Sequence, residues 1–363
     1  MMRKVLLGDV IKINPTTKVT KNQIVKFVSM DKLDPFTKVP NGYEKRKFSS
    51  GAKFTNGDTL LARITPCLEN GKTAFVDFLD DLEVAAGSTE FVILRNIEGL
   101  TDPAYIYYLS ISPAFRDYAI KSMVGTSGRQ RVQNDVLAKM ELSLPPLDQQ
   151  KKIANILSSL DEKIELNRRM NETLEQLGQA LFRHYFVDNP AARSWENIYL
   201  GDIVAITTGK GSTKANLSEY GKYPLYGANG IMGRSQSYLL NEKVIVTGRV
   251  GTLGVVRAVV DKAWFSDNVI IMKPDPSIFG YVFYVVCGID YVSLNRGSTQ
   301  PLITQTDLKN QRVKLPPLST LQRFENSYAV IFNQIQANKR QMSMLVAIRD
   351  SLLPKLISGE IEV

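Results

Sequence analysis

The chain has 363 residues, of which 44% are apolar, and a formal net charge of +9. This length supports two hydrophobic cores. The basic excess is compatible with a nucleic-acid partner, although many cytosolic proteins are mildly basic without having one. Its two cysteines, Cys67 and Cys287, are far apart in the sequence, which argues against a disulfide framework or a zinc site and indicates a reducing compartment. Asp9 interrupts the N-terminus too early for a signal peptide, and no apolar run approaches the roughly 18 residues of a membrane span. We therefore expect a cytoplasmic protein without a membrane partner or a bound metal.

The sequence repeats itself. The stretch Gly-Asp-Val-Ile at 8–11 returns as Gly-Asp-Ile-Val at 201–204, and Leu-Pro-Pro-Leu at 144–147 returns at 315–318. A long periodic helix is predicted after each Leu-Pro-Pro-Leu stretch, so one supersecondary unit is used twice. The predicted organisation is a first domain, a helix with a linker, a second domain, and a second helix with a C-terminal tail: 1–147, 148–190, 191–318 and 319–363.

The basic excess lies in the two predicted domains. Residues 1–147 carry 20 basic and 16 acidic side chains and residues 191–318 carry 14 and 9, whereas the two helical segments together are neutral. Phosphate contacts that release counterions would use such an excess.

In the first domain, strand-like runs at 59–64 and 74–78 flank a turn with basic and hydroxyl side chains, and a glycine-rich loop starts at Gly125. Arginine can read guanine with two hydrogen bonds, threonine and lysine suit phosphates, and glycine lets the backbone approach a ligand. The alternative is that both are ordinary hairpin turns. The residues predicted to contact DNA are Arg63, Thr65, Lys72, Arg129, Gln130 and Arg131.

A heptad pattern of mainly apolar residues follows each domain. The first pattern runs from Ile153 to Leu181 and the second from Phe324 to Leu352, with every member 171 residues after its counterpart. Each helix would contain about 35 residues and extend roughly 50 Å. Because the two registers match, the helices can pair along these seams.

The ends of the helices also carry signals. Proline pairs precede each helix, with Asp148 and Ser319 as predicted N-caps, and Leu353-Pro354 is expected to close the second helix.

Asn167 and Asn338 occupy equivalent seam positions. An amide in a seam fixes the register, because a slipped pairing leaves it unsatisfied. The alternative is a locally hydrated seam. A parallel pair would crowd both domains at one end, so we predict an antiparallel pair with a pseudo-two-fold axis.

The second domain repeats the loop chemistry of the first. Strand-like runs at 243–247 and 255–259 flank a Gly-Arg-Val-Gly-Thr turn, and a Gly-Ser-Thr-Gln loop follows near its end. The predicted DNA contacts here are Lys210, Thr213, Asn229, Arg249, Thr252, Arg296, Ser298 and Gln300.

Enzyme signatures are missing. Gly71-Lys72-Thr73 resembles the end of a phosphate-binding loop, but Pro66 stands where that motif requires glycine. No Asn/Asp-Pro-Pro-aromatic stretch is present to hold a flipped base for amino methylation. With His184 as the single histidine, histidine-based triads and metal sites are also disfavoured.

Several stretches together resemble the specificity subunit of type I restriction-modification systems. They are Ala-Arg-Ile-Thr-Pro at 62–66, Tyr-Gly-Ala-Asn-Gly at 226–230, the two Leu-Pro-Pro-Leu helix entries, and the tail from Arg349 to Ile361. The resemblance covers essentially the whole chain, and the helices with the tail are its most specific part.

This resemblance implies an α/β (α+β) fold with two similar target-recognition domains separated by two long antiparallel coiled-coil helices. It implies that each domain reads one half of a bipartite double-stranded DNA site, while the helices set the spacing and dock two modification subunits. S-adenosylmethionine would bind to those adenine methyltransferase subunits, and ATP with Mg²⁺ to two restriction subunits where these are present. No catalytic residue and no cofactor are expected on this chain.

One non-enzymatic alternative predicts the same helices and the same location. It is a coiled-coil scaffold whose two heads bind protein or RNA. A specificity subunit should co-purify with a methyltransferase and protect a two-part DNA sequence, and a scaffold should do neither.

Overall fold

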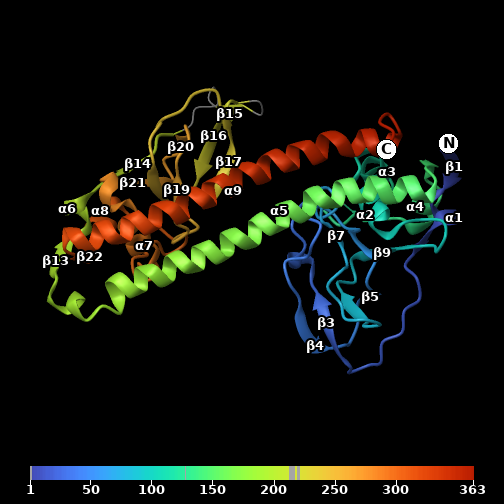
Figure 1. Ribbon diagram of the computed structural model, residues 1–363, viewed down its shortest axis with the longest axis horizontal. Coiled ribbons are helices and arrows are strands. Elements are labelled where there is room, and N and C mark those ends of the chain that lie inside the picture. Colours follow the sequence, from blue (N-terminus) through green and yellow to red (C-terminus); the bar gives the residue numbers. More distant parts are fainter. Residues whose placement is uncertain (1, 127, 212–216, 219–220) are drawn as a thin grey trace. The chain divides into compact units, whose positions relative to one another are not determined.

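The computed structural model describes residues 2–126, 128–211, 217–218 and 221–363 (Figure 1). It divides into two compact units, which are described separately below. Unit 1 is Met1–Arg169 with Asn338–Val363, and unit 2 is Met170–Ala337. Two long helices, α5 (Leu147–Phe182) and α9 (Leu318–Ser358), each contribute a segment to both units.

Unit 1 contains two four-stranded sheets. The inner sheet has the antiparallel order β2-β9-β6-β7, and the outer sheet has the order β4-β3-β8-β5 with a parallel β3–β8 pair. The strands are β2 (Ile11–Ile13), β9 (Phe91–Asn96), β6 (Thr59–Ala62), β7 (Thr73–Phe75), β4 (Glu44–Lys47), β3 (Ile24–Val28), β8 (Ala85–Gly87) and β5 (Ala52–Phe54). Two short pairs complete the strands: β1 (Arg3–Leu6) with β12 (Glu141–Leu144), and β10 (Met123–Val124) with β11 (Arg131–Val132).

Short helices pack this unit together. They are α1 (Leu7–Val10), η1 (Met30–Lys32), α2 (Pro103–Ile111), α3 (Pro113–Lys121) and α4 (Asn134–Ala138). Helix α2 begins where Asp102 accepts a hydrogen bond from the Tyr105 amide and Pro103 fixes the first turn. It is buried along nearly all its length, because it lies within the core that also holds Leu157 of α5 and Leu356 of α9.

Unit 2 repeats this plan. Its sheets have the orders β14-β21-β18-β19 and β15-β17-β16-β20, and β13 pairs with β22 as β1 does with β12. The strands are β13 (Glu196–Tyr199), β14 (Val204–Thr208), β15 (Leu217–Ser218), β16 (Tyr223–Gly227), β17 (Gly230–Ser235), β18 (Val244–Gly248), β19 (Arg257–Val259), β20 (Trp264–Phe265), β21 (Val269–Pro274) and β22 (Arg312–Leu315). The helices are η2 (Arg183–Val187), η3 (Pro190–Ser194), α6 (Leu200–Ile203), η4 (Pro276–Ile278), α7 (Phe279–Cys287) and α8 (Gln305–Lys309).

The seam positions of the long helices are buried or half-buried, as their heptad pattern predicts. In unit 1, Ile153 and Leu157 share a core with Leu353, while farther along α5 the Asn167 amide donates to Gln341 Oε1 at 2.8 Å. Residue numbers rise along α5 as they fall along α9, so the two helices are antiparallel there. In unit 2 the same two helices meet at Phe182 and Phe324, whose ring centroids lie 6.2 Å apart. The predicted fold class is confirmed.

The predicted helix ends need correction. Helices α5 and α9 begin at Leu147 and Leu318, so Asp148 and Ser319 lie in the first turn and are not N-caps. Helix α9 also continues through Pro354 to Ser358, although proline removes a hydrogen bond there. Burial of Leu353 and Leu356 in the core of unit 1 offsets that loss. None of the described helices is long and apolar enough to cross a membrane.

Candidate nucleic-acid interface

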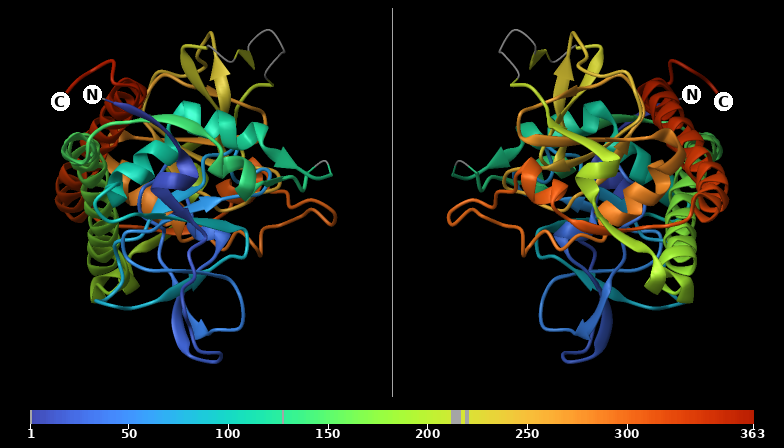
Figure 2. Two further views of the ribbon diagram at one scale, coloured as in Figure 1. Left: turned by 90° about the vertical axis from the view of Figure 1, so that its right-hand side faces the viewer. Right: turned by 90° about the vertical axis from the view of Figure 1, so that its left-hand side faces the viewer.

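Backbone hydrogen bonds join the two predicted loops of unit 1. The Thr65 amide donates to the Gln130 carbonyl at 3.0 Å, and the Val132 amide donates to the Arg63 carbonyl at 2.9 Å. The turn after β6 and the β10–β11 hairpin therefore form one surface. Figure 2 shows this teal hairpin projecting on the side opposite to α5 and α9.

Two arginines of this surface are held by local partners. The Arg131 guanidinium makes hydrogen bonds to both carboxylate oxygens of Glu90, at 2.7 to 3.1 Å, and these bonds hold the pKa of Glu90 below its usual range. Arg63 donates from Nη2 to the Val132 carbonyl at 2.9 Å. Its buried Nε, like the buried Thr65 hydroxyl, finds no partner among the described atoms.

The other predicted residues of unit 1 differ in accessibility. Arg129 is exposed near the end of the hairpin loop, and Gln130 is half-buried. The Lys72 ammonium donates to the Met30 carbonyl at 2.9 Å, so its charge is already directed toward η1. Of these three residues, Arg129 is the most available for a phosphate or a base edge.

The loops of unit 2 are joined in the same way. The Ile303 amide donates to the Arg249 carbonyl at 3.0 Å, as Val132 does to Arg63, and the Gly251 amide donates to the Pro301 carbonyl at 2.9 Å. The structure thus brings the loop of Arg249 and Thr252 beside the loop of Arg296, Ser298 and Gln300. It does so at positions that correspond to the paired loops of unit 1.

Two further loops of unit 2 reach this surface. A Cβ at Gly248 would lie 2.7 Å from the Ala228 carbonyl, so only glycine lets the turn of Asn229 lie this close. The Lys210 amide donates to the Phe265 carbonyl at 2.9 Å, next to the Ser266 amide that bonds the Tyr226 carbonyl.

Most side chains on this second surface are accessible. Arg296 pairs with the buried carboxylate of Asp307 but is still 63% exposed, and Arg249 is half-buried. Thr213 lies outside the described residues. The exposed members are Lys210, Asn229, Thr252, Ser298 and Gln300.

Sequence reasoning missed the carboxylates that hold two of these arginines. Glu90 and Asp307 position Arg131 and Arg296, and Glu90 belongs to no recognisable motif. For Asp307 the sequence carries a signal, because this residue follows the Arg296 loop closely and forms the capping box of α8 with Thr304. Glu90 precedes β9 and left no such signal.

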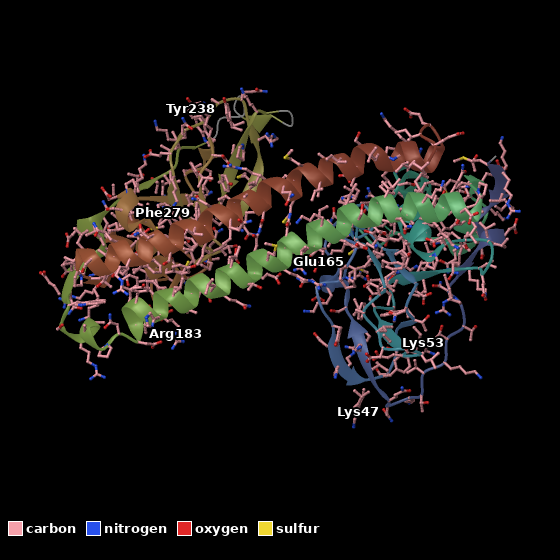
Figure 3. All side chains as sticks on the ribbon, in the orientation of Figure 1. Lys47, Lys53, Glu165, Arg183, Tyr238 and Phe279 are labelled. Atoms are coloured by element: carbon pink, nitrogen blue, oxygen red, sulfur yellow. The ribbon has the colours of Figure 1, made fainter. Side chains whose placement is uncertain are left out.

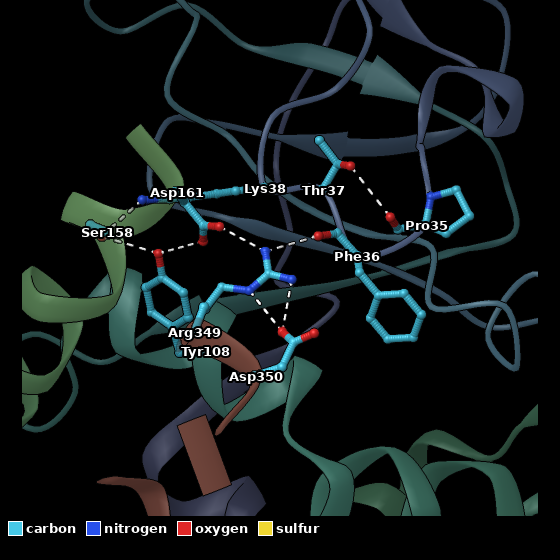
Figure 4. A network of polar contacts seen from close by, with 9 residues as sticks. All are labelled: Pro35, Phe36, Thr37, Lys38, Tyr108, Ser158, Asp161, Arg349 and Asp350. Carbon is cyan, nitrogen blue, oxygen red and sulfur yellow. Dashed lines mark hydrogen bonds and ion pairs between the residues drawn. The ribbon is translucent and has the colours of Figure 1, made fainter. Parts of the chain in front are cut away.

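A buried polar network attaches the first domain to the long helices within unit 1 (Figure 4). Arg349 of α9 donates to Asp161 of α5 at 2.7 Å and to the Phe36 carbonyl at 3.1 Å. The Tyr108 hydroxyl of α2 donates to the other oxygen of Asp161 at 2.8 Å. Burial opposes the charge of Arg349, but Asp161 and Asp350 outweigh it and raise the pKa of this guanidinium. The network therefore ties a loop and a helix of the domain to both long helices.

The equivalent contact between the domain and the long helices in unit 2 is aromatic. The repeat places Phe332 at the position of Asp161 and Gly178 at that of Arg349. A Cβ at Gly178 would lie 2.0 Å from the Tyr284 hydroxyl, so α7 packs directly against the backbone of α5. Rings of Phe182, Tyr284 and Phe324 surround this contact. A buried polar network thus attaches the first domain to the long helices, whereas aromatic packing attaches the second.

The two seam asparagines are both buried in unit 1. Asn167 is 1% exposed and Asn338 is 4% exposed, and the hydrogen bond from Asn167 reaches Gln341, one turn from Asn338. Buried amides in a helix seam can fix the register in which the two helices pair. That role for Asn167 and Asn338 stays a prediction.

Comparison with known proteins identifies the chain. Residues 2–176 and 192–337 match the family model of the type I restriction modification DNA specificity domain. The chain is a type I restriction-modification specificity subunit. A specificity subunit is the non-catalytic, DNA-recognition component of such a system, as the resemblance had implied.

Relatives support the same assignment. The MjaIX specificity subunit of Methanocaldococcus jannaschii is 26% identical over 299 residues, 71% of this chain and 69% of its own length. The HindI specificity subunit of Haemophilus influenzae is 35% identical over 139 residues, 38% of this chain and 29% of its own length. The crystal structure of a type I S subunit from Mycoplasma genitalium matches the fold with a TM-score of 0.58 at 18% identity, over 98% of this chain and 96% of that one.

Proposed function

We propose that each domain of this specificity subunit reads one half of a bipartite double-stranded DNA site. In this proposal the surface of Arg63 and Arg129 contacts one half, and the surface of Arg249 and Gln300 contacts the other. The observation that carries the proposal is the duplicated pairing of loops. Two unlike sets of polar and basic side chains lie on the same backbone arrangement, as expected for two heads that read different sequences.

We further propose that α5 and α9 set the distance between the half-sites and dock two modification subunits. Coiled helices of fixed length have the rigidity that a spacer requires. Large apolar side chains exposed at several places along these helices support a docking role, because contiguous exposed apolar patches mark interaction sites. They are Ile156, Leu166, Met170 and Leu177 on α5, and Val330, Met344 and Ile348 on α9.

The remaining chemistry would belong to the partners. The modification subunits would bind S-adenosylmethionine and methylate adenine, and restriction subunits, where present, would use ATP and Mg²⁺. Co-expression of the chain with its modification subunit, followed by purification and footprinting, tests the proposal. A stable complex that protects two separated DNA segments is the expected result. A chain that binds RNA or protein and protects no two-part sequence would instead support a scaffold.

Substitution of Arg63 tests the reading role of the first domain. Arg63→Ala should weaken binding to the cognate duplex by about 1–3 kcal/mol and relax the sequence requirement in one half-site, because a bidentate base contact is lost. Arg63 also donates to the Val132 carbonyl, so its substitution removes a hydrogen bond within the protein as well as the proposed base contact. Arg249→Ala in the second domain is the matched control and should relax the other half-site. Methylated sequences from cells with each variant would show this. An unaltered sequence and affinity in Arg63→Ala would remove this residue from the interface.

A further inference from the structure

The basic excess of the first domain comes from one segment. Residues 12–53 contain ten basic and three acidic side chains, whereas the rest of 1–147 contains ten basic and thirteen acidic. Apart from this segment, the first domain is therefore slightly acidic. The predicted reading loops lie outside it, so they do not account for the excess.

Part of this segment forms the exposed edge of the outer sheet. Strand β4 pairs with β3 and is the terminal strand in that sheet. All four of its residues are exposed, and Lys45, Arg46 and Lys47 have no carboxylate partner among the described residues. Lys26 of the neighbouring strand differs, because it is buried and paired with Asp80 and Glu83.

The backbone and an aromatic ring fix where these charges stand. Val25 pairs with Arg46 across the two strands, and the Arg46 guanidinium lies 3.2 Å from the centroid of the Phe27 ring. Lys45 and Lys47 alternate with Arg46 and so occupy the opposite face of β4. Figure 3 shows Lys47 at the end of this sheet that lies away from α5.

Other cations of the segment flank the same sheet. The Asn22 amide bonds the Phe48 carbonyl, which brings the exposed Lys21 beside the end of β4. Val19 packs against the core of Val25 and Phe48, with the exposed Lys18 next to it. Lysines on an edge strand also prevent sheets from pairing edge to edge. That purpose explains β4 but not Lys18 and Lys21, which lie outside the strand.

We propose that the exposed sheet edge at β4, with Arg46 on one face, Lys45 and Lys47 on the other, and Lys18 and Lys21 beside it (the outer basic surface), binds backbone phosphates of double-stranded DNA independently of sequence. The inference rests on the proposed function and adds a separate site to it. The reading loops would then supply the choice of sequence, and the outer basic surface would supply affinity through release of counterions.

The test measures DNA affinity against salt for the complex with its modification subunit. The variant Lys45→Gln/Arg46→Gln/Lys47→Gln should weaken cognate and unrelated duplexes by the same factor. It should also reduce the slope of log affinity against log salt by roughly 2 to 3, at about 0.9 for each phosphate contact. The methylated sequence should not change. Lys45→Arg/Lys47→Arg, which keeps the charge, should keep the slope.

A matched control removes the same charge elsewhere in the first unit. Arg3, Lys4 and Lys139 are exposed, lie outside the outer basic surface and are not on the helices proposed to dock the modification subunit, so Arg3→Gln/Lys4→Gln/Lys139→Gln should retain the original slope. An unchanged slope in the β4 variant would overturn the inference, as would an equal fall in both variants. The proposed function fails by a different result, namely that the unsubstituted complex does not prefer any two-part sequence.

Discussion

Duplication of one heptad in each long helix should lengthen the unspecified gap in the methylated sequence by about three base pairs. Repeating residues 164–170 and 335–341 preserves the seam and adds seven residues to each helix, or about 10 Å at 1.5 Å per residue. One base pair occupies about 3.4 Å along the duplex. Sequencing of methylated adenines from cells that carry the duplicated chain would measure the gap directly.

The control for this experiment is duplication in one helix alone. It leaves seven residues without a partner in the other helix, so we expect loss of methylation and no new gap. If both helices are extended and the gap keeps its length, the spacer role is wrong. A changed sequence within either half-site would also count against it, because the recognition surfaces are untouched.

Asp161→Ala should destabilise the packing of the first domain against the long helices by about 3–5 kcal/mol, because it leaves the buried Arg349 without its main partner. Arg349 is 3% exposed and Asp161 5%, so bulk water screens little of the interaction between them. Asp350 and the Phe36 carbonyl remain as partners, which favours the lower end of this range. Hydrogen exchange at the amides of α2 would report the change as faster local opening.

The double variant Asp161→Leu/Arg349→Met distinguishes a lost interaction from a general packing defect. Replacement of both members of a buried ion pair by apolar side chains is often neutral. Unit 2 already has an apolar pair at these positions, Phe332 and Gly178, so the helix pair tolerates it. Protection of α2 should therefore recover in the double variant. If the single variant exchanges like the unsubstituted chain, the network does not anchor the domain.

The helices and the repeat could be predicted because their signals are local and periodic. The heptad from Ile153 and its copy 171 residues later define the seam, and buried Asn167 and Asn338 lie where that pattern places them. The prediction of where α9 ends was wrong because it considered Pro354 alone. The helix continues because Leu356 is buried in the core of the domain at the start of the chain, which the local sequence does not reveal.

The contacts of the site depend on residues that are distant in sequence. Glu90 and Arg131 are separated by 41 positions, and Asp161 and Arg349 by 188, so no spacing rule connects them. The loops of Arg63 and Gln130 could be named as candidates from their composition, but their backbone pairing required the fold. Counting charges along the sequence located the basic excess of the first domain only within residues 1–147 as a whole, and the strand order shows that part of it lies at the exposed edge strand β4.

The most direct test of two domains reading two half-sites is to sequence methylated adenines in cells with and without this chain, in the presence of its modification subunit. The expected motif has two specified parts separated by a gap of fixed length, and it should disappear when the chain is removed. A single uninterrupted motif, or a motif that persists without the chain, would contradict the account.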